Sequence, residues 1–399
     1  MWYVSTRGMT PRVNFEGALF SGYAPDGGLF MPEELPQLGR ETLCQWSTLS
    51  YPSLVKELCA LFIGPELMPR DDLNDLIHRA FSRFRHKEVV HLSRLRNGLN
   101  VLELWHGVTY AFKDLSLCCT AQFLQYFLEK RKKHVTVVVG TSGDTGSAAI
   151  EMGASPVLHF FLLLFVLLVS CLRSHCSSLL SKAGCIAQKM GLPIRLVAAV
   201  NLNDIIHRTV QRGDFSLSET VKPTLASAMD IQVPYNMERI FWLLSDSDSQ
   251  VTRTLMEQFE RTQSVSLPKE LQSKLSAAVT SESVSDEAIT QTMGRCWEEN
   301  QYLLCPHSAV AVSYHYQQMD RQQPSPPRCC LAPASAAKFP EAVLAAGLTP
   351  ETPSEILTLE KKETRCTPMR KSDDWTLILR NTIEDIGQRW TGYCLNASE

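Results

Sequence analysis

A lysine at the start of a predicted helix is the first residue in this sequence that could do chemistry. Lys113 follows the apolar residues 110–112 and precedes Asp114. Helical spacing of apolar residues continues to about Arg131, and cations at 130–133 suit the negative end of the helix dipole. Desolvation and the positive end of the dipole would both lower the pKa of Lys113 and give the neutral amine of a Schiff-base lysine. Local physics alone favours a simpler interpretation, a surface Lys–Asp pair that opens a helix.

A glycine-rich turn between a strand and a helix is the second candidate site. Residues 134–139 form a β-branched run typical of a strand buried on both faces of a parallel sheet, and residues 140–146 read GTSGDTG. Backbone N–H groups of such a loop can converge on an anion at the N-terminus of the following helix. The spacing fits neither the Rossmann fingerprint nor a Walker A loop. The alternative is a tight turn without a ligand, which the hydroxyl and carboxylate side chains in the loop make less attractive.

Overall composition excludes some classes of protein. The 399 residues suggest two or three domains, and 39 Lys and Arg against 42 Asp and Glu give a net charge of −3. This balance argues against a nucleic-acid-binding protein, so no nucleic-acid partner is expected. The 13 cysteines have no zinc-site spacing, which predicts reduced thiols and no metal site.

Several segments, in their order and letters, resemble the threonine synthase family. They are STRG at 5–8, GYAPDGGLFMPEELP at 22–36, LELWHGVTYAFKD at 102–114, GTSGDTGSAA at 140–149, NLNDIIHR at 201–208, SAMDIQVPYNMER at 227–239 and CPHSAVAV at 305–312. The resemblance implies an α/β protein of fold type II among pyridoxal-phosphate-dependent enzymes, similar to the tryptophan synthase β chain. In that fold, two α/β/α layers face each other across the cofactor.

The same resemblance implies the roles of particular residues. Lys113 would form the Schiff base with pyridoxal 5'-phosphate and move protons at the α and β carbons of the substrate. Ser308 would face the pyridine nitrogen of the cofactor, where a neutral hydroxyl suits β,γ chemistry. The loop that holds the substrate carboxylate and the cofactor's phenolic oxygen would be Ser142, Gly143, Asp144 and Thr145.

The implied reaction is a lyase reaction on a small phosphorylated amino acid. Threonine synthases convert O-phosphohomoserine to threonine, whereas some relatives are associated with phospholyase chemistry on O-phosphohomoserine or O-phosphothreonine. That chemistry gives 2-oxobutyrate, ammonia and phosphate. The resemblance also leads us to expect a homodimer.

The resemblance is lost over residues 152–182. Family members carry there much of the small domain and a second glycine-rich loop that cradles the cofactor phosphate, of which only Ala183 and Gly184 remain. The alternative function is therefore a catalytically impaired variant that acts by binding. The predicted domains are an N-terminal threonine synthase-type domain (1–90), a catalytic domain with a truncated small domain (91–345, interrupted at 152–182) and a C-terminal helical tail (346–399).

An apolar stretch at residues 156–172 leaves three interpretations open. As a helix its 17 residues would span roughly 25 Å, slightly short of the hydrocarbon core of a membrane. It could be a short transmembrane helix, a buried core helix or a segment foreign to the fold. No signal peptide is recognisable at the N-terminus, so a cytoplasmic location is expected, with a membrane-associated or secreted protein as the alternative.

Smaller clusters allow two interpretations each. Arg83, Arg85, His86 and Lys87 could attract a phosphorylated substrate, although a solvated basic face is the preferred interpretation. His106 could approach the cofactor or be a hydrogen-bonded core histidine. Three residues near a predicted helix start also allow two interpretations, namely Asn236, Glu238 and Arg239. This trio could build the active-site wall, or it could cap the helix and form salt bridges.

Overall fold

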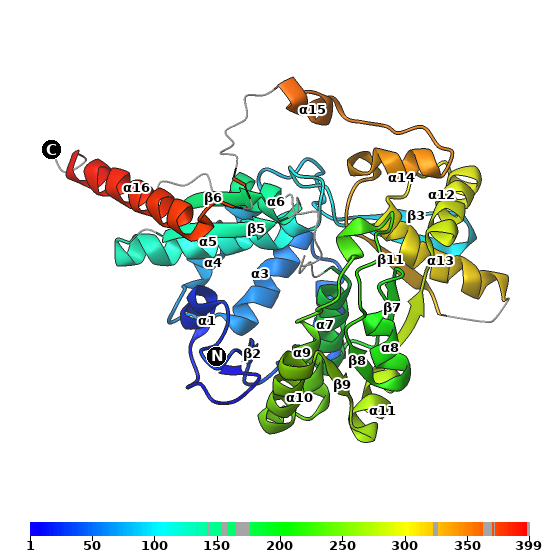
Figure 1. The fold of residues 1–399 in the computed structure, drawn as a ribbon, viewed down its shortest axis with the longest axis horizontal. Coiled ribbons are helices and arrows are strands. Elements are labelled where there is room, and N and C mark those ends of the chain that lie inside the picture. Colours follow the sequence, from blue (N-terminus) through cyan, green and yellow to red (C-terminus); the bar gives the residue numbers. More distant parts are fainter. Residues whose placement is uncertain are drawn as a thin grey trace.

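A computed structural model describes most of the chain, namely residues 1–133, 135–141, 144–152, 158–164, 176–321, 326–361, 369–370 and 372–396. Figure 1 shows helices packed around several short sheets, with α16 at one end of the molecule and the segment α7–α11 gathered in another part. The helices are α1 (Phe15–Ser21), α2 (Arg40–Trp46), α3 (Tyr51–Phe62), α4 (Arg70–Phe81), α5 (Lys113–Arg131), α6 (Asp144–Met152), α7 (Cys176–Lys189), α8 (Ile205–Arg212), α9 (Met237–Leu244), α10 (Ser249–Thr262), α11 (Lys269–Ala278), α12 (Asp286–Asn300), α13 (Pro306–Asp320), α14 (Pro340–Ala345), α15 (Ser354–Leu357) and α16 (Trp375–Asn396). Short 3-10 turns are η1 (Arg96–Gly98), η2 (Ser227–Met229), η3 (Ala336–Lys338) and η4 (Leu359–Lys361).

Parallel strand pairs form the framework that positions the candidate site. One sheet has the order β11-β4-β3, in which β4 is parallel to β11 and antiparallel to β3. Two more parallel pairs are β7 with β10 and β5 with β6, and two antiparallel pairs are β1 with β2 and β8 with β9. The strands are β1 (Tyr3–Ser5), β2 (Phe30–Pro32), β3 (His91–Arg94), β4 (Leu99–Glu103), β5 (Val135–Thr141), β6 (Leu158–Leu164), β7 (Leu196–Val200), β8 (Asp214–Ser216), β9 (Ser264–Ser266), β10 (Val279–Ser283) and β11 (Arg328–Ala332).

Three apolar cores hold these elements together. One lies around β7 and helices α8–α11, and its largest fully buried side chains include Phe215, Phe241 and Met256. A second packs β4 and β11 against α12 and α13. A third joins α4 to α5 through residues such as Ile77 and Phe127, so the start of the chain and the helix of Lys113 share a core. Burial of these apolar surfaces is the main stabilising contribution.

The elements predicted around the two motifs are confirmed. The helix expected over 114–131 is α5, which begins one residue earlier at Lys113. The strand expected over 134–139 is β5, whose described residues run from Val135 to Thr141. The helical pattern near the C-terminus is α16. Nine cysteines with described side chains are free, including the adjacent residues at 118–119 and 329–330.

The helical interpretations of the apolar stretch at 156–172 are wrong for its described residues. Residues 158–164 form β6, a strand parallel to β5 with Val138 opposite Phe161. A strand of a parallel sheet is apolar on both faces, so its sequence is a continuous apolar run like that of a buried helix. Residues 153–157 and 165–175 lie outside the described part. In that part of the chain, no helix is long and apolar enough to cross a membrane.

Candidate active site

The loop that precedes Lys113, residues 104–112, is held against the segment that follows β11. The amide of Leu104 donates to the carbonyl of Ala332 over 3.0 Å, and the amide of Phe112 donates to that of Pro333 over 2.7 Å. Because β4 and β11 are parallel, both chains leave the sheet at the same edge. Lys113 therefore begins α5 at the carboxyl edge of this sheet, where open α/β sheets bind ligands.

Asp114 fixes the turn that presents Lys113. Its side chain is fully buried, and its two oxygens accept from Thr109, one from the amide over 2.8 Å and one from the hydroxyl over 2.7 Å. A Cβ at Gly107 would lie 2.2 Å from this carboxylate, so only glycine allows the approach. Burial raises the pKa of Asp114, although the hydrogen bonds from Thr109 oppose that rise.

The simpler interpretation of a surface Lys–Asp pair is therefore wrong. Asp114 points inward to Thr109, whereas Lys113 is half-buried at the first position of α5. The preceding Tyr110 has a φ of +57°, and its carbonyl accepts from the amide of Ser335. A non-glycine residue in this region is strained, and such strain is concentrated at functional sites.

Ser308 lies in the first turn of α13 and is brought to the same edge of the sheet. It is 1% exposed, and its hydroxyl lies 3.0 Å from the Sγ of Cys305, which caps the helix. Burial raises the pKa of Cys305, so this residue stays a neutral thiol. The thiol also accepts from the backbone of Ala334, which pairs with Ala111 beside Lys113. These contacts connect Lys113 and Ser308 through one short stretch of backbone.

The glycine-rich loop is described only in part. β5 ends at Thr141 and α6 begins at Asp144, so the expected strand–loop–helix arrangement is confirmed. Ser142, Gly143 and the side chain of Asp144 lie outside the described residues. Thr145 is half-buried in the first turn of α6, the end of a helix that favours an anion.

The basic cluster before β3 is more than a solvated face. Arg83 and Arg85 are exposed, but Arg83 donates to the backbone carbonyl of Glu151 in α6 over 3.1 Å and forms an ion pair with its carboxylate. Arg85 lies 4.4 Å from the ring centroid of Tyr110 and donates to its hydroxyl. The preferred interpretation from the sequence, a solvated basic face, is therefore confirmed for Arg83, Arg85 and Lys87, and the two arginines also contact α6 and the loop before Lys113.

His106 is a hydrogen-bonded core histidine. Its Nε2 lies 2.7 Å from the Oε2 of Glu103, and its side chain is 12% exposed. Burial alone would raise the pKa of Glu103, but hydrogen bonds from His106, Ser93 and Tyr302 outweigh it and lower that pKa to about 2. Glu103 is therefore an anion inside the fold. Sequence reasoning overlooked it because a single glutamate in a short strand carries no pattern.

The trio near residue 236 mainly forms salt bridges and hydrogen bonds. Glu238 is 1% exposed and accepts from the Nε of Arg7 over 3.1 Å and from the hydroxyl of Thr6 over 2.6 Å. Arg239 donates to Asn236 over 2.8 Å, while Asn236 makes no side-chain cap for α9. The salt-bridge interpretation of the trio is thus confirmed for Glu238, and the capping interpretation is wrong for Asn236. The motif at 5–8 lies against the motif at 227–239.

Comparison with known proteins agrees with this geometry. The family model "Threonine synthase N terminus" matches residues 2–81, and "Threonine synthase, C-terminal" matches residues 308–379. Threonine synthase-like 2 from Pongo abelii is 68% identical to this chain, and the alignment covers the full length of both proteins. The structure of threonine synthase from yeast has a TM-score of 0.87 at 28% identity, covering 96% of this chain and 98% of that one. The pyridoxal-phosphate-bound threonine synthase from Brucella melitensis has a TM-score of 0.83 at 28% identity, covering 92% and 96%.

The fold is thus that of the fold type II, pyridoxal-phosphate-dependent threonine synthases. The chain belongs to the threonine synthase family, in its threonine synthase-like 2 branch. The alignment with the Pongo abelii relative has 484 positions, whereas this chain has 399 residues. At 85 positions of the alignment, this chain therefore has a gap. The shortened length expected from the sequence is therefore confirmed.

Proposed function

We propose that this chain is a pyridoxal-phosphate-dependent lyase that acts on a small phosphorylated amino acid. The observation that carries the proposal is the position of Lys113, the first residue of α5, at the carboxyl edge of the β11-β4-β3 sheet. Two hydrogen bonds between Thr109 and the buried Asp114 hold the turn before it. The likeness of the fold to a threonine synthase that contains this cofactor supports the same function.

The described residues fit the ring end of the cofactor. The half-buried amine of Lys113 would hold it covalently, and the buried hydroxyl of Ser308 would face its ring nitrogen. Because the Cys305 thiol stays protonated, it can donate to the Ser308 oxygen and leave the hydroxyl proton of Ser308 for the ring. Thr145 and the amide groups at the start of α6 would bind a carboxylate or the phenolic oxygen.

The reaction that we propose removes phosphate from O-phosphohomoserine or O-phosphothreonine. With one water molecule, either substrate gives 2-oxobutyrate, ammonia and phosphate. Bound pyridoxal phosphate supplies the electron sink for carbanions at the substrate carbons. Lys113 would move protons at the α and β carbons, and the loop around Thr145 would orient the substrate carboxylate.

A second candidate is a family member with an impaired cofactor site. The observation that favours it is the loss of 85 aligned positions, together with the absence from the sequence of a second glycine-rich loop of Pro-Thr-Gly-x-x-Gly-Asn character. Without such a loop, the cofactor phosphate would lose the backbone donors that usually hold it. The chain would then act by binding, without turnover.

One experiment separates the two candidates. The full chain is incubated with pyridoxal phosphate and desalted, and the bound cofactor is measured by the visible absorption of its lysine-bound form. The lyase predicts one cofactor per chain, loss of this absorption in Lys113→Ala and its retention in Lys133→Ala, an exposed lysine beyond the same helix. Release of phosphate from either substrate would then support the reaction. A chain that keeps no cofactor would contradict the lyase and support the impaired variant.

A further inference from the structure

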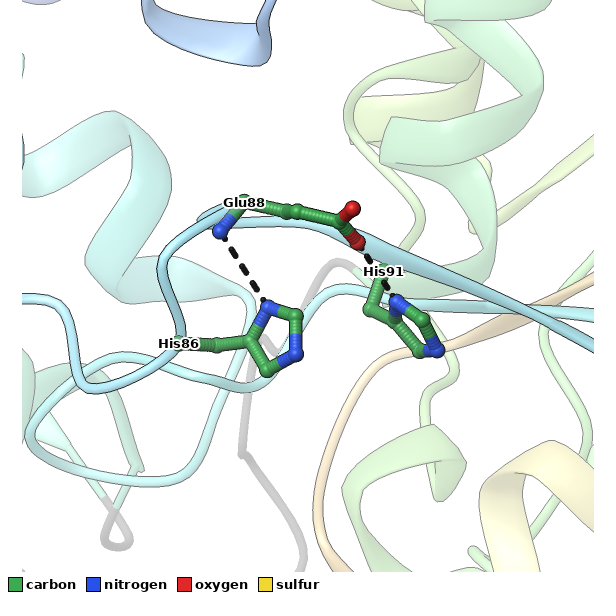
Figure 2. A group of neighbouring side chains, drawn as sticks. All are labelled: His86, Glu88 and His91. Carbon is green, nitrogen blue, oxygen red and sulfur yellow. Dashed lines mark hydrogen bonds and ion pairs between the residues drawn. The ribbon is translucent and has the colours of Figure 1, made fainter.

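A cluster of two histidines and a glutamate lies in the turn that enters β3. His86, Glu88 and His91 each offer a ligand atom, and these three atoms all lie within 4.8 Å of one another. Figure 2 shows the Glu88 carboxylate at the ring of His91, with the ring of His86 beneath the same turn. None of these residues belongs to the site around Lys113.

The backbone of the turn brings these side chains together. Val89, between Glu88 and His91, has a φ of +67°, which a β-branched residue rarely adopts. Its side chain is 4% exposed, so core packing holds the strained conformation. The amide of Val89 donates to the carbonyl of His86 over 2.9 Å and closes the turn. The cluster is therefore a fixed feature of the backbone.

The nitrogen atoms present the lone pairs that a metal ion needs. The Nδ1 of His86 accepts from the amide of Glu88 over 3.2 Å, so this nitrogen carries no proton, and a metal ion would take its lone pair in place of this long hydrogen bond. The Nδ1 of His91 lies 2.6 Å from the Oε2 of Glu88. A shift of the His91 proton to Nε2 would free that Nδ1 as a second ligand without any net release of a proton.

The ligand set selects a class of metal ion. Two imidazoles and one carboxylate suit Zn²⁺ and similar divalent transition metals, whereas Mg²⁺ and Ca²⁺ prefer oxygen ligands alone. Ligand bonds of about 2.1 Å in a tetrahedron separate the ligand atoms by roughly 3.4 Å. Glu88 is exposed and both imidazoles are partly exposed, so movements of about an ångström can reach that spacing. The fourth position would hold water.

Further contacts tie the cluster to the loop before Lys113. The ring of His86 lies 4.7 Å from the ring of His106. The Nε2 of His106 is in turn hydrogen-bonded to the carboxylate of Glu103. The amide of Arg85 donates to the carbonyl of His106 over 3.1 Å. An ion bound to His86 would therefore fix the position of His106 and its loop.

From this geometry we infer that His86, Glu88 and His91 form a binding site for a divalent transition-metal ion of the Zn²⁺ class. The ion has a structural role, since it holds the turn before β3 against the loop of residues 104–112. The inference does not depend on the proposed lyase reaction, because no residue of the cluster takes part in it. It departs from the prediction, made from cysteine and histidine spacing, that the chain has no metal site.

The test is a Co²⁺ titration of the full chain, kept reduced and freed of metal by chelation. The wild type should bind one Co²⁺ with visible d–d absorption, and one equivalent of Zn²⁺ should displace it. His91→Ala and Glu88→Gln should each weaken binding at least tenfold. His78→Ala, an exposed histidine on α4, should bind like the wild type.

Two controls make the result decisive. Glu88→Gln changes an exposed side chain by one atom, so it should fold like the wild type, which circular dichroism without metal would check. In the wild type, Zn²⁺ should shift the ring ¹⁵N resonances of His86 and His91, a measurement that needs no variant. Unchanged affinity in Glu88→Gln and His91→Ala would overturn the inference. Thiolate-to-cobalt charge transfer with unshifted histidine signals would do so as well, since it would place the ion on cysteines.

Discussion

The Asp114 carboxylate accepts both the amide and the hydroxyl of Thr109, at 2.8 and 2.7 Å, and so closes the turn from which Lys113 emerges. The backbone carbonyl of Thr109 in turn accepts from the Nζ of Lys338 over 2.8 Å. The amide, the hydroxyl and the carbonyl of Thr109 thus each have a partner. A buried network of this kind is costly to break, because its remaining members lose both water and their partners.

We predict that Asp114→Ala lowers the free energy of unfolding by about 1–3 kcal/mol, because it leaves the partly buried Thr109 donors without an acceptor. Urea unfolding measures this change. Asp75→Ala, at an exposed position of α4, should change the free energy by less than about 0.5 kcal/mol. Thr109→Val should have little further effect in the Asp114→Ala background. Full additivity of the two changes would contradict the hydrogen-bonded pair.

We predict a larger loss for Arg7→Ala. Arg7 and Glu238 are 4% and 1% exposed, and Arg7 also contacts Glu260 at 2.6 Å. Removing Arg7 leaves the carboxylate of Glu238 buried without the cation that is hydrogen-bonded to it, which costs about 3–5 kcal/mol. Denaturant unfolding at neutral pH measures this loss.

Arg12→Ala is the matched control for that prediction. Arg12 and Glu33 form an exposed pair with 3.4 Å between the charged atoms, and such pairs contribute less than about 1 kcal/mol. Equal effects of Arg7→Ala and Arg12→Ala would show that the buried charge is not what stabilises the contact between the N-terminal segment and α9.

Sequence patterns predicted the elements that depend on local order. The helix from Lys113 to Arg131 follows from apolar spacing and terminal charges, and β5 follows from its β-branched run. Both patterns lie within twenty residues. The order of the family motifs then led to Lys113 and Ser308, and the structure brings these two residues to one edge of the sheet.

Long-range contacts could not be predicted in this way. Arg7 and Glu238 are 231 residues apart, and nothing near either residue identifies its partner. The apolar run at 158–164 suited a helix as well as a strand until its pairing with β5 was known. The sequence shows His86, Glu88 and His91 close together along the chain. That their side chains lie close together in space depends on the positive φ of Val89, which the sequence does not indicate.

We predict that Glu103 makes the chain sensitive to acid. Its pKa is about 2 in the folded chain, against an ordinary value of 4.5. The charged carboxylate is therefore more stable in the folded state than in the unfolded state. The resulting stability, about 3 kcal/mol, is fully present above pH 4.5 and is lost as the pH falls towards 2. Glu103→Gln should therefore show a weaker loss of unfolding free energy between pH 5 and 2.

Glu298→Gln provides the comparison for that acid titration. Glu298 is exposed on α12, so its removal should leave the pH dependence of the unfolding free energy like that of the wild type. If the Glu103→Gln and wild-type curves run parallel from pH 5 to 2, the hydrogen bonds of Glu103 do not favour its charged form.

We predict a pH dependence of the same sign, but at higher pH, for Lys182 in α7. Burial lowers its pKa to about 7, and repulsion from Arg239 adds to the effect. The unfolded chain holds a proton on this amine up to about pH 10.5, so the unfolded state binds more protons between pH 7 and 10.5. Lys182 therefore destabilises the fold most below pH 7, and the penalty fades as the pH rises.

Lys182→Met should reveal this penalty, because it keeps an unbranched side chain of similar length and removes the charge. We expect the variant to exceed the wild type in unfolding free energy by up to about 5 kcal/mol at pH 6, with the difference shrinking steadily towards pH 10. Lys189→Met, on the same helix at an exposed position, should show no such trend. A difference between Lys182→Met and the wild type that stays constant from pH 6 to 10 would mean that Lys182 keeps its charge in the folded chain throughout this range.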